Sequence, residues 1–88
     1  MTNHDTLDTS RLKTLVDAGA ISHASARGVP GGYVLAVRVG MVEKAIRAHK
    51  KTNARIFSTL EGLSNYCLAA GIRRIDVDLA GYSKEALF

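Results

Sequence analysis

Cysteine, proline and tryptophan are almost missing from this sequence, which has one cysteine, one proline and no tryptophan among its 88 residues. A single cysteine excludes an internal disulfide and a zinc site built from several cysteines. Long hydrophobic runs are missing too, since none approaches the roughly 20 residues that a membrane-spanning helix needs. The opening segment, Met1 to Ser10, is polar and has no apolar signal core. We therefore expect a soluble, cytoplasmic protein with no membrane contact.

The composition that remains is typical of one small globular domain. Hydrophobic residues make up 47% of the chain and charged residues 23%. From the scaling of surface area with mass, a chain of this size buries about 63% of its surface on folding, which is enough for one modest core. We expect a single domain over residues 1–88, with flexible ends at 1–8 and 83–88.

The residue types that carry catalysis and metal binding are too scattered to predict a site. The histidines His4, His23 and His49 are far apart and lie near no cysteine, so the spacing of zinc ligands is missing. Cys67 falls on the apolar stripe of a predicted helix, where cysteine behaves as a small hydrophobic residue. The glycines around Pro30 lack the lysine and the serine or threonine of a phosphate-binding loop. We expect no enzymatic activity, no cofactor and no metal site.

Asp76 and Asp78 form the one pair of carboxylates whose spacing in the sequence suits a chemical function. They are two residues apart on a predicted strand, so they share a face at a spacing of about 6 to 7 Å. Such a pair can hold a cation or act as an acid and a base. Arg73 and Arg74 stand beside them in the sequence, so we interpret the segment as a solvated strand face whose charges compensate one another.

The first half of the chain predicts a short helix followed by a hairpin. Thr9 or Ser10 can accept hydrogen bonds at the start of a helix, apolar residues follow at helical spacing, and Gly19 suits its end. Farther on, Pro30-Gly31-Gly32 predicts a turn between two apolar, β-branched runs. The expected strands cover residues 20–29 and 33–39.

The second half predicts a capped helix and a final strand. Ser58 and Glu61 match a capping box, and Gly71 is placed to end the helix, so a helix is expected over 58–71. Residues 72–79 alternate apolar and polar side chains, as in a strand with one wet face. The fold class is therefore α+β, with a mostly antiparallel sheet of four or five strands and the capped helix packed across it.

Residues 41–57 fit two structures. Met41 to Lys51 contains good helix formers with apolar residues at helical spacing, so propensity favours a helix. If the same residues form a strand, their side chains alternate between its two faces. Lys51-Thr52-Asn53 would then turn the chain back into residues 54–57. We favour the hairpin, because of a family resemblance described below.

The positive charge of the chain is concentrated in this segment. The net charge is +4, whereas residues 44–55 alone carry five cationic side chains and no acid. Such a segment attracts polyanions, because neutralising phosphates releases condensed counterions. A solvated hairpin tip is the competing interpretation, and no aromatic residue is present to stack on a base. The DNA-contact candidates are Lys44, Arg47, His49, Lys50, Lys51 and Arg55.

Several stretches together resemble a known family. They are Gly31-Gly32-Tyr33, Val37-Arg38-Val39-Gly40-Met41, Arg55-Ile56-Phe57-Ser58-Thr59-Leu60-Glu61, Gly71-Ile72 and Asp76-Val77-Asp78-Leu79. Over most of residues 10–82 the chain is similar to ParC-like partition-associated proteins, which are encoded beside plasmid and mobile-element partition genes. Members similar to this chain often have a glycine in a short basic connection that reads as a hairpin, where this sequence has Lys50-Lys51-Thr52-Asn53.

The resemblance implies a role in maintaining or segregating mobile DNA, by contact with DNA or with partition proteins. It supplies no catalytic residues. Our leading hypothesis is a non-enzymatic accessory protein of plasmid or mobile-element maintenance that touches DNA phosphate through the basic segment. The alternative is a protein-interaction module without a nucleic-acid role, whose exposed strand at Ile75 to Leu79 pairs with a second copy or another partner. Steep weakening of binding with salt would distinguish the first from the second.

Overall fold

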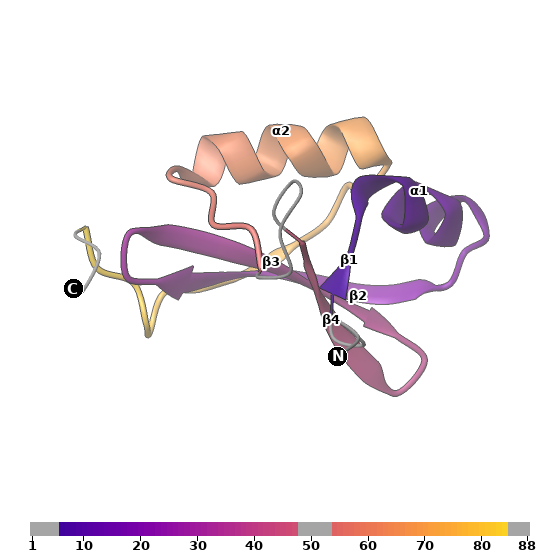
Figure 1. Cartoon of the computed structure of the whole chain (residues 1–88), viewed down its shortest axis with the longest axis horizontal. Coiled ribbons are helices and arrows are strands. Elements are labelled where there is room, and N and C mark those ends of the chain that lie inside the picture. Colours follow the sequence, from indigo (N-terminus) through magenta and orange to yellow (C-terminus); the bar gives the residue numbers. More distant parts are fainter. Residues whose placement is uncertain (1–5, 48–53, 85–88) are drawn as a thin grey trace.

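One five-stranded sheet and two helices make up the residues that the computed structural model describes, 6–47 and 54–84. Figure 1 shows the two helices lying on the sheet. The α+β fold class is confirmed. In chain order the elements are β1 (Thr6–Leu7), α1 (Thr9–Asp17), β2 (Ile21–Val29), β3 (Gly32–Val39), β4 (Val42–Ile46), α2 (Leu60–Ala70) and β5 (Asp76–Asp78).

The sheet is mixed, with strand order β1-β4-β3-β2-β5. The long central pairs β2–β3 and β3–β4 are antiparallel, as expected from the hairpins. The two short outer pairs, β1 with β4 and β2 with β5, are parallel. The expectation of a mostly antiparallel sheet therefore holds for the central strands and not for the edges.

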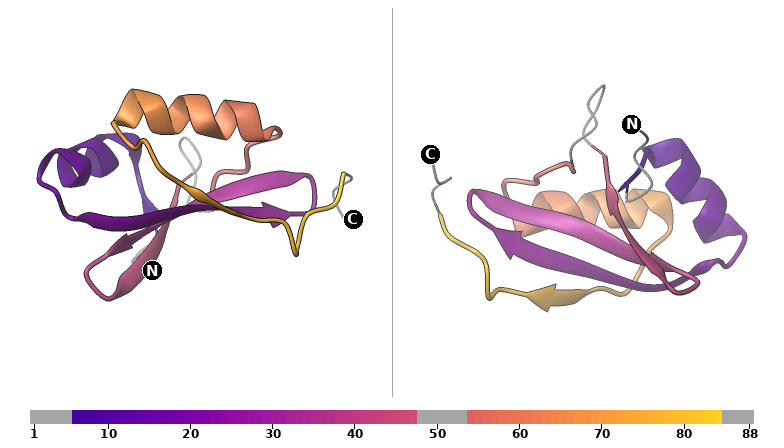
Figure 2. Two further views of the ribbon diagram at one scale, coloured as in Figure 1. Left: turned by 180° about the vertical axis from the view of Figure 1, so that it is seen from behind. Right: turned by 60° about the horizontal axis from the view of Figure 1, so that its bottom comes forward.

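This strand order explains why one face of the sheet carries both helices. The chain crosses from β1 to β2 through α1 and from β4 to β5 through α2, and each crossover joins parallel strands in the same direction across the sheet. Crossovers of this kind are almost always right-handed, which puts both helices on the same face. Figures 1 and 2 show α1 and α2 on that face, and neither of the two described helices covers the other face.

The hydrophobic core lies between the sheet and the helices. β3 contributes Leu35 and Val37, which are fully buried, and β2 contributes Ala24 and Ala26 beside them. Leu12 from α1 and Leu63 from α2 close the core from above and are also fully buried. The prediction that residues 33–39 form a central strand is confirmed, since β3 lies in the middle of the sheet.

The face without helices is closed by its own long side chains. Ser25 and Ala36, which are register partners in the centre of this face, are buried although no helix covers them. Arg27 on β2 reaches over β3 to form an ion pair with Glu43 on β4. We infer that the aliphatic stem of the arginine shields the small residues beneath it, as long charged side chains commonly do.

Within residues 41–57, the described parts, 41–47 and 54–57, follow the hairpin interpretation and not the helix. β4 pairs with β3 on one side and with β1 on the other, so tertiary pairing overrides the helix propensity of this segment. Beyond β4 an antiparallel bridge joins Arg47 to Ala54, and the Arg55 amide donates to the Ile46 carbonyl at 2.6 Å. The expected turn at Lys51-Thr52-Asn53 lies outside the described residues.

Both helices are capped by a residue next to a predicted cap, and the helix expected over 58–71 runs from Leu60 to Ala70. Asp8 caps α1 instead of Thr9 or Ser10, and its carboxylate accepts the Arg11 amide at 2.8 Å. Thr59 caps α2 instead of Ser58, and its hydroxyl accepts the Gly62 amide at 3.0 Å. The helix ends were correct, because Gly71 has the expected left-handed conformation, with φ of 94°.

The expected flexible ends at 1–8 and 83–88 and the final strand also need correction. Thr6–Leu7 form β1 and pair with β4, so these residues belong to the sheet. Near the other end Ser83 forms a parallel bridge with Pro30. The expected strand over 72–79 is assigned only at Asp76–Asp78. The ends at 1–5 and 85–88 lie outside the described residues. None of the helices described is long and apolar enough to cross a membrane.

Gly32 lets two segments approach closely at the start of β3. The Tyr33 amide donates to the Phe57 carbonyl at 2.8 Å, and the Phe57 amide donates to the Tyr33 carbonyl at the same distance. A Cβ atom on Gly32 would overlap the Phe57 carbonyl oxygen, which is backbone and has no rotamer to escape into. A glycine is therefore required at this position because the Phe57 backbone leaves no room for a side chain, and not because of its φ angle.

Gly32→Ala is expected to lower the free energy of unfolding by about 2 to 3 kcal/mol, the usual range for forced overlap in a packed site. Urea denaturation followed by circular dichroism measures the change. Gly62→Ala in α2 is the control, since its Cβ would meet only the Thr59 hydroxyl, and it should stay within about 1 kcal/mol of the parent. Equal stability of the two variants would contradict the close approach at Gly32.

Candidate functional site

Among the described residues of the basic segment, the cationic side chains do not form one cluster. Three of its predicted DNA-contact residues are described: Lys44 is partly buried on β4, Arg47 follows the end of β4, and Arg55 lies in the returning segment. The other three, His49, Lys50 and Lys51, lie outside the described residues. Arg47 and Arg55 each have a neighbour that uses part of the charge or surface of the side chain.

Arg47 is held by a carboxylate. Its guanidinium lies 3.2 Å from a carboxylate oxygen of Asp8, and the same aspartate caps α1 through its other oxygen. The pair is about half exposed on the aspartate side, so it contributes little to stability. It does neutralise much of the charge that Arg47 would offer to a phosphate.

Arg55 lies over aromatic rings instead of facing solvent alone. Its guanidinium carbon is 4.4 Å from the centre of the Phe57 ring and 5.3 Å from that of Tyr66. Tyr66 comes from α2, and its hydroxyl is 2.7 Å from the Thr9 hydroxyl at the start of α1. The arginine is therefore part of a cation–π contact that joins the returning segment to both helices.

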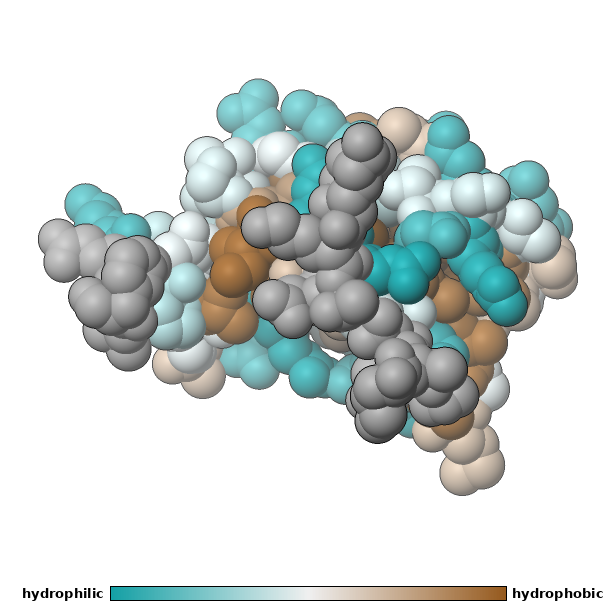
Figure 3. Space-filling view, in the orientation of Figure 1, coloured by the Kyte–Doolittle hydropathy of each residue, from teal (hydrophilic) through white to brown (hydrophobic). Residues whose placement is uncertain are grey.

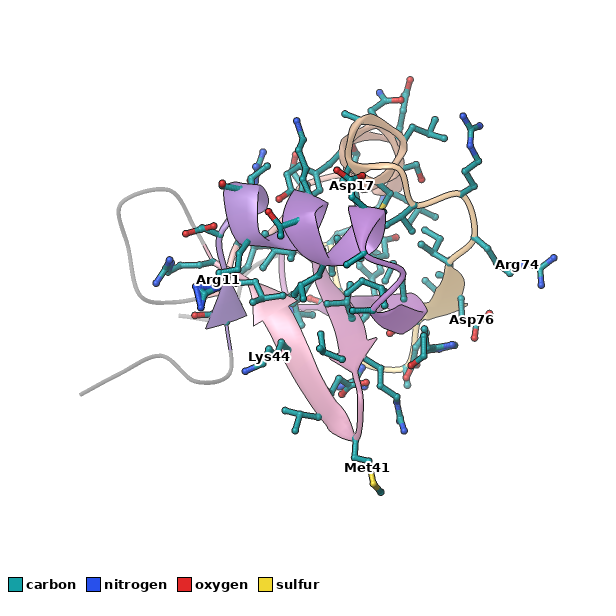
Figure 4. All side chains as sticks on the ribbon, turned by 90° about the vertical axis from the view of Figure 1, so that its right-hand side faces the viewer. Arg11, Asp17, Met41, Lys44, Arg74 and Asp76 are labelled. Atoms are coloured by element: carbon teal, nitrogen blue, oxygen red, sulfur yellow. The ribbon has the colours of Figure 1, made fainter. Side chains whose placement is uncertain are left out.

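A surface pocket brings Lys44 and Arg47 of the basic segment beside Arg11 of α1. It has a volume of about 410 Å³, and its polar lining comes from Asp8 and Arg11 on the helix side and from Lys44 and Arg47 on the β4 side. Figure 3 shows hydrophilic residues where α1 meets β4, and Figure 4 shows Arg11 and Lys44 on this side of the molecule. Arg11 was not among the predicted residues, because its contact with β4 arises only when α1 folds back on the sheet.

Asp76 has a different partner from the one expected. Its carboxylate lies 3.2 Å from Nε2 of His23 on β2, and both side chains are about half exposed or more. His23 and Asp76 line a pocket of about 480 Å³ together with Arg73 and Arg74. Within it, Asp76 forms its ion pair with the histidine. The two aspartates follow the register of β5 with β2, with Asp76 opposite Ser25 and Asp78 opposite Arg27.

The outer edge of β5 combines an open strand with apolar surface. β5 pairs only with β2 and is the last strand of the described sheet, as the right-hand view of Figure 2 shows. Val77 and Leu79 are 44% and 58% exposed, and Leu68 on α2 is 56% exposed. A pocket of about 170 Å³ opens between α2 and the segment before β5, lined by Leu68, Cys67, Ile72 and Ile75 among others.

Cys67 is a core residue, as predicted. It is buried in α2 among the residues that face the sheet. Desolvation by burial raises the pKa of its thiol to about 11, because the buried thiolate loses its hydration. A thiol in this state is a poor nucleophile at neutral pH.

The comparisons with known proteins give one match. The family model described as ParC-like matches residues 7–85 of the chain. No curated protein and no solved structure matches the chain significantly.

Cys67 is expected to make stability depend on pH in the alkaline range. In the unfolded chain its thiol ionises near the ordinary value of 9.0, while in the folded chain it keeps its proton up to about pH 11. Raising the pH through this range therefore favours the unfolded state, and the free energy of unfolding should fall. Denaturation at several pH values measures this slope. Cys67→Ala should flatten it, and an unchanged slope in that variant would contradict the assignment.

Proposed function

Because this chain belongs to the ParC-like family, we propose that it is a non-enzymatic accessory protein of plasmid or mobile-element maintenance that acts in the cytoplasm by binding another protein. The observation that carries the proposal is the outer edge of β5, which is the last strand of the sheet in the described part of the chain and lies beside exposed apolar side chains. An extended segment can add to such an edge through backbone hydrogen bonds.

The residues around this edge favour a protein-binding surface and not a merely solvated one. Proteins usually protect an edge strand with charges or a cover, since open edges pair with other chains. Asp76 and Asp78 provide charge here, but Val77 between them and Leu79 after them are exposed. Leu68 and the apolar pocket beside it would receive the side chains of an added strand.

The positions of the basic residues give less support to DNA contact as the main activity. Arg47 is paired with Asp8, and Arg55 lies over two aromatic rings. Phosphate binding through Arg47 would have to compete with its carboxylate partner.

A titration tests the proposal. The ¹⁵N-labelled chain is titrated with each purified partition protein encoded beside its own gene, and the amides of Ile75 to Leu79 and of Leu68 are expected to shift. Leu68→Lys should weaken binding by about tenfold, as loss of an apolar anchor does. Met41→Lys is the matched control, because Met41 is exposed at the distant β3–β4 turn. Shifts confined to residues around Lys44 and Arg47 would contradict the proposal.

DNA binding is a second candidate, supported by the pocket that brings Arg11 beside Lys44 and Arg47. Three cationic side chains from two elements surround one surface hollow there, and one aspartate offsets them. A phosphate would find more positive than negative charge at this position.

Asp8→Asn separates the two roles of Asp8. Asparagine caps a helix about as well as aspartate, but it removes the charge that pairs with Arg47. If the pocket binds phosphate, affinity for a short DNA duplex at low salt should rise several-fold, and binding should weaken as salt increases. Arg11→Ala should lower it. Fluorescence anisotropy measures both variants, and equal affinities for both and for the parent would eliminate this candidate.

A further inference from the structure

The charges next to β5 restrict which strand can add to its edge, provided that the proposed protein contact is made there. Arg74, Ile75 and Asp76 follow one another, so a positive and a negative side chain flank one apolar residue. Figure 4 shows Arg74 and Asp76 on the same side of the molecule, both pointing outward. Ile75 is partly buried against the core. When two copies of this segment run antiparallel, the arginine of each copy can face the aspartate of the other.

A second copy that adds to this edge in an antiparallel arrangement has few possible registers. The two copies are related by a two-fold axis, and an axis normal to the sheet passes between a residue and the same residue of the other copy. Side chains that lie directly opposite each other interact, and like charges at such positions are unfavourable. Each register can therefore be judged from the charges that it brings together.

Most registers place like charges in contact. Centring on Asp76 sets its carboxylate against its own copy on the axis, although it also sets Arg74 against Asp78 twice. Centring on Asp78 sets that carboxylate against its own copy, and centring on Val77 sets Asp76 against Asp78 twice. Centring on Arg74 sets that arginine against its copy. Centring on Leu79 needs a straight strand beyond it, but the chain turns there, with the Tyr82 amide donating to the Leu79 carbonyl at 3.0 Å.

The register centred on Ile75 places unlike charges in contact without any like-charge pair. It sets Arg74 against Asp76 of the other copy, and the symmetry repeats this pair. We propose that β5 together with the residues just before it, Arg74 and Ile75, binds a second copy of this chain, antiparallel, with Ile75 opposite Ile75. The two sheets then form one continuous sheet across the contact.

The apolar residues fit this arrangement. A two-fold axis normal to the sheet keeps the helix-covered faces of both copies on the same side. Ile75 of each copy then lies near the pocket lined by Leu68 and Ile75 of the other. The exposed side chains of Leu68 and Val77 lie beside this edge in each copy.

The pair between His23 and Asp76 is compatible with the contact. His23 approaches Oδ2 of Asp76, and a carboxylate has a second oxygen that can accept from an arginine. The Asp76 side chain is 70% exposed, so its second oxygen is accessible to Arg74 of a second copy.

Charge reversal tests both the dimer and its register. Analytical ultracentrifugation of the full chain should show a monomer–dimer equilibrium between about 10 µM and 1 mM, the range of a small interface. Arg74→Asp and Asp76→Arg should each weaken the dimer by about tenfold or more, because each creates two like-charge pairs. An equimolar mixture of the two variants should form a dimer again, since unlike charges then meet at both positions.

Two further variants control for loss of fold and for register. Arg73→Asp makes the same charge change at the neighbouring arginine, which lies opposite Val77 of the second copy, and it should leave the dimer intact. Ile75→Cys should form a disulfide-linked dimer on oxidation, because opposite residues of an antiparallel pair have Cα atoms about 4.5 to 5.5 Å apart. Val77→Cys should not, since its copies would be about 14 Å apart along the strand.

The results separate this inference from the proposed function. A chain that stays monomeric at 1 mM, or variants that do not recover on mixing, overturn the second copy as occupant. If a partition protein still shifts the amides of Ile75 to Leu79, the proposed function stands and another chain occupies the edge. If the dimer forms as described but no partition protein binds, the proposed function fails and the self-association remains.

Discussion

The parallel pairing of β5 with β2 determines which surfaces this protein offers. Only three residues, Asp76–Asp78, make the pairing, yet it sets the outer edge of the sheet and brings Asp76 to His23. It also leads the chain from the end of α2 past the core, so that Ile75 packs against the core while Val77 remains exposed. If β5 paired instead at the β1 edge, the apolar pocket beside Leu68 would not adjoin an open strand.

The two candidate surfaces lie at opposite ends of the sheet. The cationic pocket adjoins β1 and β4, and the open edge belongs to β5, with the two long central strands between them. Contacts at both ends are therefore sterically compatible in one molecule. A dimer through β5 would also display two cationic pockets, one at each outer end of the joined sheet, which raises the effective affinity for any polyanion that reaches both.

Much of the fold follows from local sequence signals, and the differences have particular causes. Gly71 and the Pro30 turn act through backbone conformation within a few residues, so the second helix and the first hairpin were predictable. Thr6–Leu7 were not recognisable as a strand, because two residues carry no period and their pairing with β4 is distant in sequence. The caps at Asp8 and Thr59 stood beside equally suitable hydroxyl residues, so composition alone did not select between them.

The candidate site was harder to predict than the fold. The charge count located the basic segment, but the partners of Arg47 and Arg55 come from α1, α2 and the returning chain, which only the tertiary structure brings together. The strand at Ile75 to Leu79 was recognised by its alternation, and its place at the edge became visible only with the strand order. The most direct test of the account is an isotope-filtered NOE experiment on a mixture of labelled and unlabelled chains. Contacts between Ile75 of one copy and Ile75 of the other are predicted, and a spectrum at 1 mM without any contact between copies at residues 73–77 would contradict it.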